Sequence, residues 1–277
     1  MPLKCGMAEA ETTTELREAG GRTRLYVTVA LSPGASVPAS EGQAHYLLHV
    51  MRAKAGDRLR LFNGRDGEWR AGIAQAGKRG VTLTCIAQTA PQICVPDIWL
   101  AFAPVKKTPA DYLVQKTTEL GAAALLPVFT RRTIVTRVNM ERLAANAIEA
   151  AEQSGRLSVP DIRAPVLFDK LLAAWPKDRR IFFCDEGGDA KPLAEAVTTA
   201  PDGPAAILTG PEGGFDPAER EALRALRFVT PVSLGPRILR ADTAALAALA
   251  VWQSLRGDWI SSRPSTSSGE NSQSLPC

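Results

Sequence analysis

Residues 205–214 read Ala205-Ala206-Ile207-Leu208-Thr209-Gly210-Pro211-Glu212-Gly213-Gly214, an apolar run that leads directly into a glycine-rich loop. A short apolar run without polar alternation is typical of a strand buried on both faces of a parallel sheet. The next residues, Asp216-Pro217-Ala218-Glu219, supply an N-cap, a proline at the first helical position and a capping-box carboxylate. The stretch predicts a strand, a loop and a helix, and the glycines allow the backbone of the loop to approach a ligand closely.

A second loop, Leu234-Gly235-Pro236-Arg237-Ile238-Leu239-Arg240, also follows a short apolar run. Two such loops at the carboxyl ends of neighbouring strands would form a crevice, where ligands of open α/β sheets bind. The first loop carries an acid, Glu212, where a phosphate-binding loop needs a lysine and a hydroxyl, and its glycine order differs from the dinucleotide fingerprint. The pair of loops therefore favours another ligand, although tight strand-to-helix turns alone would also explain the glycines.

Residues 97–260 alternate between strand-like and helix-like segments. Strands are predicted at 98–103, 124–129, 180–184, 205–209 and 228–234, and helices at 109–119, 139–152, 191–199, 216–226 and 243–256. This alternation predicts an α/β domain with a mostly parallel sheet and helices on both faces.

Residues 22–90 have a different pattern. Leu25, Val27 and Val29 alternate, one helix is predicted at 41–51, and short strands separated by tight turns are predicted at 58–62, 68–74 and 81–87. This pattern predicts a small β-barrel domain, joined to the second domain by a linker at 91–96. The polar segments at 1–21 and 261–277 are predicted to be disordered.

The composition restricts the class of protein. The chain has 277 residues, 45% of them hydrophobic, which is enough for two domains, and its net charge of +4 is compatible with a nucleic-acid partner. Five cysteines without a Cys-x-x-Cys pair argue against a disulfide framework and a zinc site. No apolar stretch is long enough to span a membrane, and no secretory signal is recognisable. We therefore expect a cytoplasmic protein without a bound metal.

Several separated blocks carry a resemblance to a known family. They are HYLLHVMRAKAGD (45–57), DYLVQKTTELG (111–121), EAAEQSGR (149–156), LTGPEGG (208–214) and LGPRILRADT (234–243). In this order they resemble the SPOUT-class RNA methyltransferases, specifically the RsmE group. The resemblance implies S-adenosylmethionine as the methyl donor and methylation of N3 of a uridine in small-subunit ribosomal RNA, with the RNA expected within the assembled small subunit. It also implies a trefoil knot, an RNA-binding PUA-like N-terminal domain and a homodimer, to whose interface Leu246, Leu249 and Trp252 of the final helix would contribute.

The resemblance assigns roles to particular residues. It implies cofactor contacts at Leu208, Thr209, Gly210, Pro211, Glu212, Gly213, Gly214, Leu234, Gly235, Ile238, Leu239 and Thr243. Ile238 and Leu239 could equally be core residues. The resemblance places the segment 152–156 at the dimer interface facing the active site.

Arg240 and Arg156 are the candidate catalytic residues, because a guanidinium can stabilise the anion left on the uracil ring. For Arg240 the alternative is a surface arginine paired with Asp242, a predicted cap of the last helix; for Arg156 it is a partner of the last helix carbonyls. Candidate RNA contacts are Arg24, His45, Arg52, Arg132 and Glu152. The rival functions are methylation of a different RNA, RNA binding without catalysis, and nucleotide binding of the doubly wound class.

Overall fold

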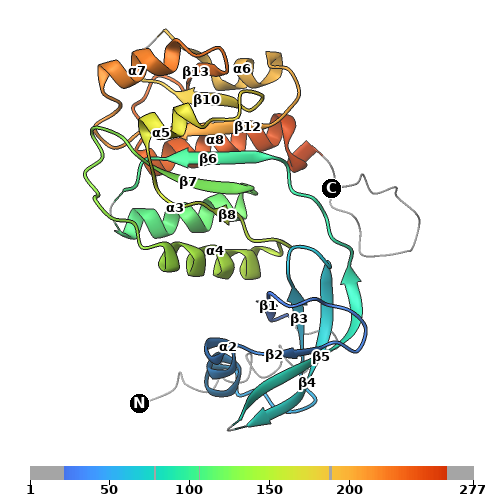
Figure 1. Ribbon diagram of the computed structural model, residues 1–277. Coiled ribbons are helices and arrows are strands. Elements are labelled where there is room, and N and C mark those ends of the chain that lie inside the picture. Colours follow the sequence, from blue (N-terminus) through green and yellow to red (C-terminus); the bar gives the residue numbers. More distant parts are fainter. Residues whose placement is uncertain (1–21, 78, 106, 187–188, 261–277) are drawn as a thin grey trace, which may run out of the picture. The chain divides into compact units, whose positions relative to one another are not determined.

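The computed structural model describes residues 22–77, 79–105, 107–186 and 189–260. The disordered extensions predicted at 1–21 and 261–277 lie outside the described residues. The chain divides into two compact units, coloured along the sequence in Figure 1. The first unit contains the chain up to Ile93 together with Ala151–Val159, although this segment lies inside the range predicted for the second domain. The second unit contains Cys94–Ala150 and the chain from Pro160 onward.

The second unit is built on a parallel sheet with the strand order β11-β13-β10-β12-β6-β7-β8. Its strands are β6 (Ile98–Phe102), β7 (Ala124–Phe129), β8 (Asp161–Ile162), β9 (Val166–Leu167), β10 (Arg180–Cys184), β11 (Lys191–Pro192), β12 (Ala205–Thr209) and β13 (Val229–Ser233). β9 pairs with the end of β7. All five residues of β12 are buried, as expected for a central strand covered on both faces.

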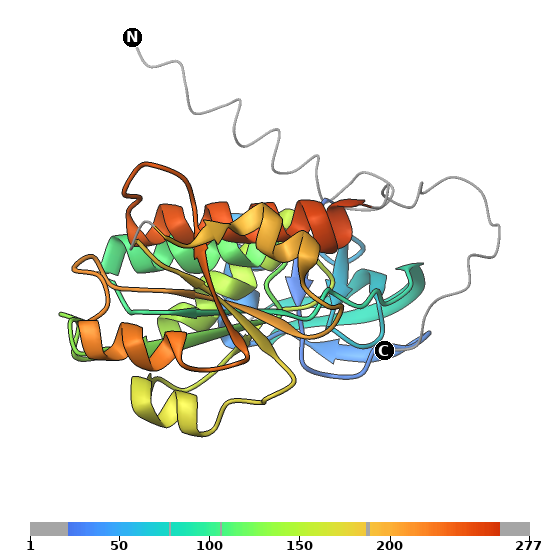
Figure 2. The ribbon, with the colours of Figure 1, turned by 90° about the horizontal axis from the view of Figure 1, so that it is seen from above.

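Helices cover both faces of this sheet, as the view from above shows (Figure 2). The helices are α3 (Lys107–Glu119), α4 (Met140–Ser154), α5 (Phe168–Ala173), α6 (Leu193–Thr199), α7 (Pro217–Arg224) and α8 (Ala241–Arg256), with a 3-10 turn η2 (Asp258–Ile260) after α8. α3, α6 and α8 lie together on one face, while α5 and α7 lie on the other. The predicted α/β architecture is therefore observed.

The dimer residues predicted on the final helix need a correction. Leu249 is fully buried and Trp252 nearly so, because α8 packs against α3, α6 and β12 of the same unit. Only the half-buried Leu246 remains open to contact with another subunit. The homodimer itself stays a prediction, and so does the trefoil knot.

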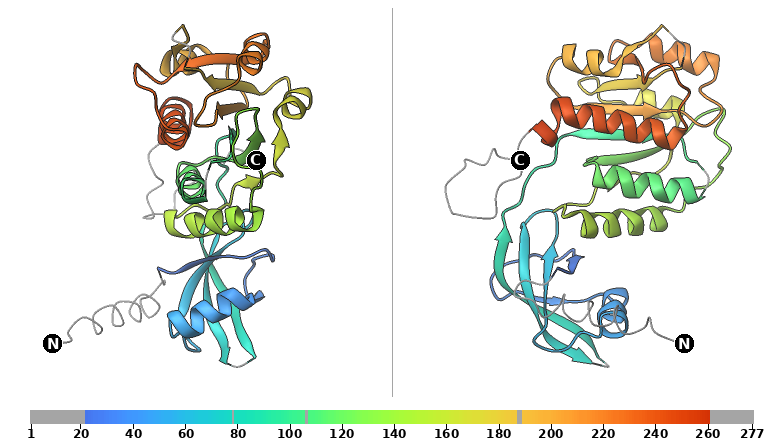
Figure 3. Two further views of the ribbon diagram at one scale, coloured as in Figure 1. Left: turned by 90° about the vertical axis from the view of Figure 1, so that its left-hand side faces the viewer. Right: turned by 180° about the vertical axis from the view of Figure 1, so that it is seen from behind.

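The first unit contains a five-stranded sheet with the order β1-β3-β4-β5-β2. Its elements are β1 (Arg24–Tyr26), β2 (Ser36–Pro38), α2 (Glu41–His45), the π-helix η1 (Tyr46–Val50), β3 (Arg58–Phe62), β4 (Glu68–Gly77) and β5 (Gly80–Ala90). β1 runs parallel to β3, and the other pairs are antiparallel. Three register shifts between β4 and β5 accompany the bend of this long hairpin (Figure 3).

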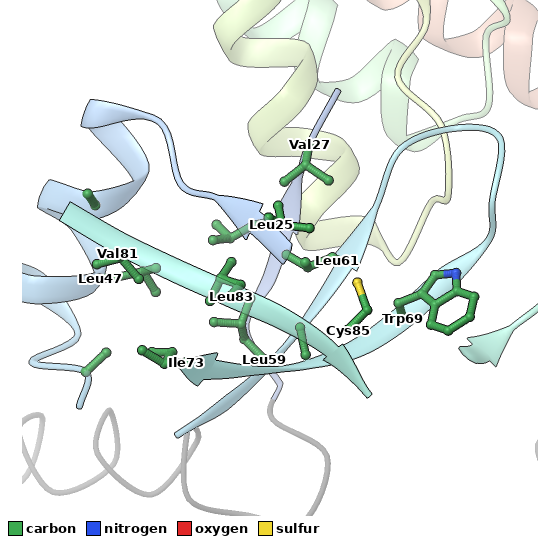
Figure 4. Packing of buried hydrophobic residues seen from close by; sticks show 14 of the residues in the cluster. Leu25, Val27, Leu47, Leu59, Leu61, Trp69, Ile73, Val81, Leu83 and Cys85 are labelled. Carbon is green, nitrogen blue, oxygen red and sulfur yellow. The ribbon is translucent and has the colours of Figure 1, made fainter. Parts of the chain in front are cut away.

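Side chains from the strands and from α2–η1 form one apolar core in this unit. Leu25, Leu47, Leu59 and Leu83 point into it (Figure 4). Val29 does not continue the alternation of Leu25 and Val27, because β1 ends at Tyr26 and Val29 is 39% exposed. The helix predicted at 41–51 changes to π-helical geometry from Tyr46 onward. In the described part of the chain, no helix is long and apolar enough to cross a membrane.

Candidate functional site

The two glycine loops lie at the same edge of the parallel sheet, after β12 and β13. They do not follow neighbouring strands as the sequence suggested, because β10 lies between β12 and β13. The carboxyl end of β10 therefore contributes Cys184, Asp185 and Glu186 to the space between the loops. The result is a cleft of about 780 Å³.

The structure brings most of the predicted cofactor contacts together in this cleft. Its walls include residues 209–214 and Leu234, Gly235, Ile238 and Leu239. Two predicted contacts do not line the cleft: Leu208 is buried in the apolar core, and Thr243 lies exposed in the first turn of α8. Their contact with a cofactor stays a prediction. Arg240 and Arg132 line the cleft as well.

The glycines of the first loop have different reasons to be glycine. A Cβ at Gly210 would come within 2.7 Å of the Phe215 ring, and Gly214 has a φ of +68°, which side chains rarely tolerate. These two positions are explained by the turn itself. A Cβ at Gly213 would meet only Arg132, at 3.9 Å, which is an ordinary contact. Gly213 is therefore the position where the protein alone does not demand glycine.

A buried carboxylate fastens a neighbouring loop to this turn. Glu219, 4% exposed, accepts hydrogen bonds from the backbone N–H of Arg131 at 2.8 Å and from that of Asp216 at 3.1 Å. The second bond completes the predicted capping box of α7. Arg132, the next residue along, donates from Nη1 to the carbonyl of Gly213 at 3.0 Å. Arg132, predicted to contact RNA, therefore forms part of the cleft wall.

The second loop presents apolar and positive side chains to solvent. Ile238 is 84% exposed, which excludes the alternative that it is a core residue, and Leu239 is half-buried. α8 begins at Ala241, so Arg240 occupies its N-cap position, and the Asp242 carboxylate accepts only the N–H of Thr243 at 2.9 Å among the described contacts. Within the described part of the chain, no carboxylate forms an ion pair with Arg240, and its predicted alternative pairing with Asp242 is not observed.

An ion network supports the β10 side of the cleft. The carboxylate of Asp185, 3% exposed, accepts from Arg220 Nε at 2.6 Å and from Arg224 Nε at 2.8 Å. Hydrogen bonds from Arg224 lower the pKa of the exposed Asp189 to about 2. Glu186 faces the loop, since its Oε2 lies 3.8 Å from the position of a Cβ on Gly214. These residues were not predicted from the sequence, although a strand followed by Asp185-Glu186 in a parallel sheet is a usable signal.

The remaining candidates lie in the first unit. Arg24, predicted to contact RNA, is corrected: its side chain is 8% exposed and binds Glu68 and three backbone carbonyls. Oε1 of Glu152 accepts the N–H of Tyr26 at 2.9 Å. Arg156 is half-buried and donates from Nε to Ser158 Oγ at 3.2 Å.

His45 and Arg52 are exposed on α2–η1 and just after it. The rings of His45 and His49 lie 4.8 Å apart. Arg52 has a φ of 51°, an uncommon conformation for a residue with a side chain. Both residues are accessible to RNA, and this role stays a prediction. Among the described residues, no three His, Cys, Asp or Glu side chains gather as a metal site would require.

Comparison with known proteins identifies the family of this chain. Residues 94–253 match the model of the RNA methyltransferase domain, and residues 40–85 match that of the RNA methyltransferase PUA domain. A Rickettsia conorii protein named ribosomal RNA small subunit methyltransferase E (RsmE) is 32% identical over 228 residues, which cover 82% of this chain and 93% of that protein. The chain belongs to the RsmE family.

Other RsmE proteins agree. The Bacillus subtilis RsmE is 32% identical over 233 residues, covering 78% of this chain and 90% of that protein. The crystal structure of the RsmE from Neisseria gonorrhoeae bound to S-adenosyl methionine has a TM-score of 0.78 and 28% identity, and the match covers 86% of this chain and 99% of that one. The predicted combination of a PUA-like unit with an α/β methyltransferase unit is thereby confirmed.

Proposed function

We propose that this RsmE-family chain transfers the methyl group of S-adenosylmethionine to N3 of a uridine in small-subunit ribosomal RNA. The observation that carries the proposal is the cleft at the carboxyl ends of β10, β12 and β13, whose walls combine exposed apolar side chains with charges of both signs. The RsmE relatives supply the reaction class, since they are named for methylation of small-subunit ribosomal RNA.

The residues of the cleft fit S-adenosylmethionine chemically. The apolar side chains of Ile238 and Leu239 suit the adenine ring. Glu186 and Glu212 supply negative charge for a sulfonium and an ammonium group, and Arg220 supplies positive charge for a carboxylate. At Gly213 the protein leaves room for a Cβ, so the missing side chain frees space in the cleft rather than relieving a clash.

When bound, S-adenosylmethionine supplies a methyl group already activated by its positive sulfur. Transfer would form the N3–CH₃ bond, break the S–CH₃ bond and release the N3 proton to solvent. Arg240 stands at the end of the second loop with an exposed guanidinium that no carboxylate of the described chain neutralises. It would stabilise the negative charge that develops on the uracil ring, and such a preorganised donor lowers the barrier by about 3 kcal/mol. Arg132 holds the first loop through the carbonyl of Gly213.

We further propose that the active form is a cytoplasmic homodimer that acts on the assembled small subunit. In this arrangement the exposed His45 and Arg52 contact ribosomal RNA, and the segment 152–156 of one protomer completes the cleft of the other. Arg156 would then contribute a second guanidinium near the substrate. Contacts of this kind to phosphates position an RNA without reading its sequence.

The test begins with calorimetric titration of the purified protein with S-adenosylhomocysteine and, separately, with ATP. We expect the protein to bind S-adenosylhomocysteine and not ATP. Transfer of a labelled methyl group is then measured with isolated small subunits and with free ribosomal RNA, and the modified nucleoside is identified by mass spectrometry. We expect the modified nucleoside to be 3-methyluridine and to form faster in isolated small subunits than in free ribosomal RNA.

Each other outcome points to a different conclusion. If the methyl group is found at another position, or only on another RNA, the protein would still be a methyltransferase but the proposed substrate would be wrong. RNA binding without binding of S-adenosylhomocysteine would indicate a non-catalytic protein. Preference for ATP would remove the methyltransferase assignment of the cleft.

A further inference from the structure

Arg24 is enclosed by the protein in a way that differs from an RNA-binding arginine. Its Nε donates to Glu68 Oε2 at 2.7 Å, and its guanidinium carbon lies 4.5 Å from the centre of the Phe62 ring. The side chains of Arg24 and Glu68 are each 8% exposed. A phosphate could therefore reach this guanidinium only by displacing these partners.

The other hydrogen bonds of Arg24 go to one short segment. Nη1 donates to the carbonyl of Ala151 at 2.8 Å and to that of Glu152 at 3.1 Å, while Nη2 donates to the carbonyl of Arg156 at 2.8 Å. The first two carbonyls belong to the last turn of α4, and the third follows Gly155, whose φ of +81° reverses the chain. One planar guanidinium therefore binds the backbone on both sides of this reversal.

A second contact fixes the same segment. The carboxylate of Glu152 accepts the backbone N–H of Tyr26, two residues after Arg24 on β1. The far end of Arg24 is fixed as well, because Glu68 also binds Arg60 at 3.2 Å and Thr89 at 2.8 Å. Burial alone would raise the pKa of Glu68, but hydrogen bonds from Arg24 and Thr89 outweigh this effect and lower the pKa of the carboxyl from its ordinary value.

We propose that Arg24 is a positioning residue that holds the segment 152–156 in the conformation needed for methyl transfer, and that it acts through Arg156. This inference rests on the proposed function, in which Arg156 approaches the substrate. Fork-shaped donation to three carbonyls is specific to arginine, since a lysine ammonium is a point charge that cannot span them. The contacts of Arg24 thus give a structural reason for an arginine at this position of the chain.

Arg24→Lys tests the proposal, with Arg65→Lys as the matched control, because the exposed Arg65 also donates to a backbone carbonyl of this unit, that of Thr28. Hydrogen exchange should become faster at the amides of residues 153–157 in Arg24→Lys only. Affinity for S-adenosylhomocysteine should not change. The single-turnover rate on small subunits should fall roughly ten- to a hundredfold, because a small displacement of a reacting group has an effect of this size.

A double-mutant cycle separates positioning from general destabilisation. In an Arg156→Ala background, adding Arg24→Lys should change the rate less than about twofold, since residues that act as a unit are not additive. Additive losses, or an unchanged rate in Arg24→Lys despite faster exchange, would overturn the proposal. If Arg24→Lys does not fold, Glu68→Gln is used in its place, because this variant keeps the guanidinium of Arg24 but weakens its contact with residue 68. An unchanged rate with Glu68→Gln would also overturn the proposal. Absence of methylation by the unmodified protein would instead refute the proposed function, while the exchange result would still report on the Arg24 contacts.

Discussion

Removal of the Glu219 carboxylate should destabilise the second unit at the point where two loops meet. Glu219 is 4% exposed and accepts the N–H groups of Arg131 and Asp216 at 2.8 and 3.1 Å. Hydrogen bonds to an ionised group contribute about 1.5–3 kcal/mol each. Because Arg131 and Asp216 lie near the surface and their N–H groups can bind water after the mutation, we take the lower value for each bond.

Glu219→Ala should therefore lower the free energy of unfolding by about 3 kcal/mol. For a unit of this size, this corresponds to a decrease in Tm of roughly 6–12 °C. Glu219→Gln should cost less, since the amide keeps one acceptor oxygen but turns an NH₂ group toward the other N–H donor. Affinity for S-adenosylhomocysteine should decrease as well, because Arg131 and Arg132 together attach their loop to the cleft.

Thermal unfolding followed by circular dichroism, alongside calorimetric titration, checks these values. Glu221→Ala is the matched control, because Glu221 lies exposed on the same helix, two residues further along. Equal Tm values for Glu219→Ala and Glu221→Ala would show that the carboxylate does not hold the loops together, and the reasoning would be refuted.

Four further predictions follow from the cleft and its surroundings. Gly213→Val should fold, because a Cβ fits there, but should lose S-adenosylhomocysteine binding in a titration. The control Gly77→Val, at an open strand position, should bind normally. Normal binding by both variants would exclude Gly213 from the ligand site. Arg240→Ala should lower the single-turnover rate about a hundredfold or more with cofactor affinity nearly unchanged, and Arg240→Lys should recover only part of it; an unchanged rate would return Arg240 to a surface role. Arg52→Ala should weaken RNA binding and flatten its salt dependence in filter binding without affecting cofactor titration, and an identical salt slope would remove Arg52 from the RNA surface. Burial raises the pKa of Cys184 to about 12, so alkylation of this residue at pH 8 should be at least about a hundredfold slower than in the urea-unfolded protein and should accelerate as the pH rises toward that value. Mass spectrometry measures both rates, and equal rates would contradict this.

The central strands could be predicted from the sequence because a parallel sheet buries both faces of each strand. β7, β10 and β12 have the predicted bounds, and each is a short apolar run between turn residues. β8, β9 and β11 contain two residues each, so they carry no periodicity that a pattern could reveal.

The parts of the site that are formed by local backbone patterns could be predicted from the sequence. The parts formed by side chains from distant positions in the sequence could not. Loop glycines and a capping box are local patterns, and both were found at the first loop. The burial of Arg24 depends on carbonyls more than a hundred residues away, and sequence alone presents it as one more basic residue near the N-terminus. The same holds for Asp185, whose two arginine partners lie on α7.

The composition of the first unit has a consequence for its synthesis on the ribosome. Ala151–Val159 belongs to this unit but emerges almost sixty residues after Ile93. Translation adds roughly 5–20 residues per second. The segment that supplies the carbonyls of Ala151, Glu152 and Arg156 is therefore synthesised roughly 3 to 12 s after the strands of the sheet. Until then the guanidinium of Arg24 lacks three of its acceptors, so the nascent first unit should complete its folding only after the part of the second unit up to Ala150 has been translated.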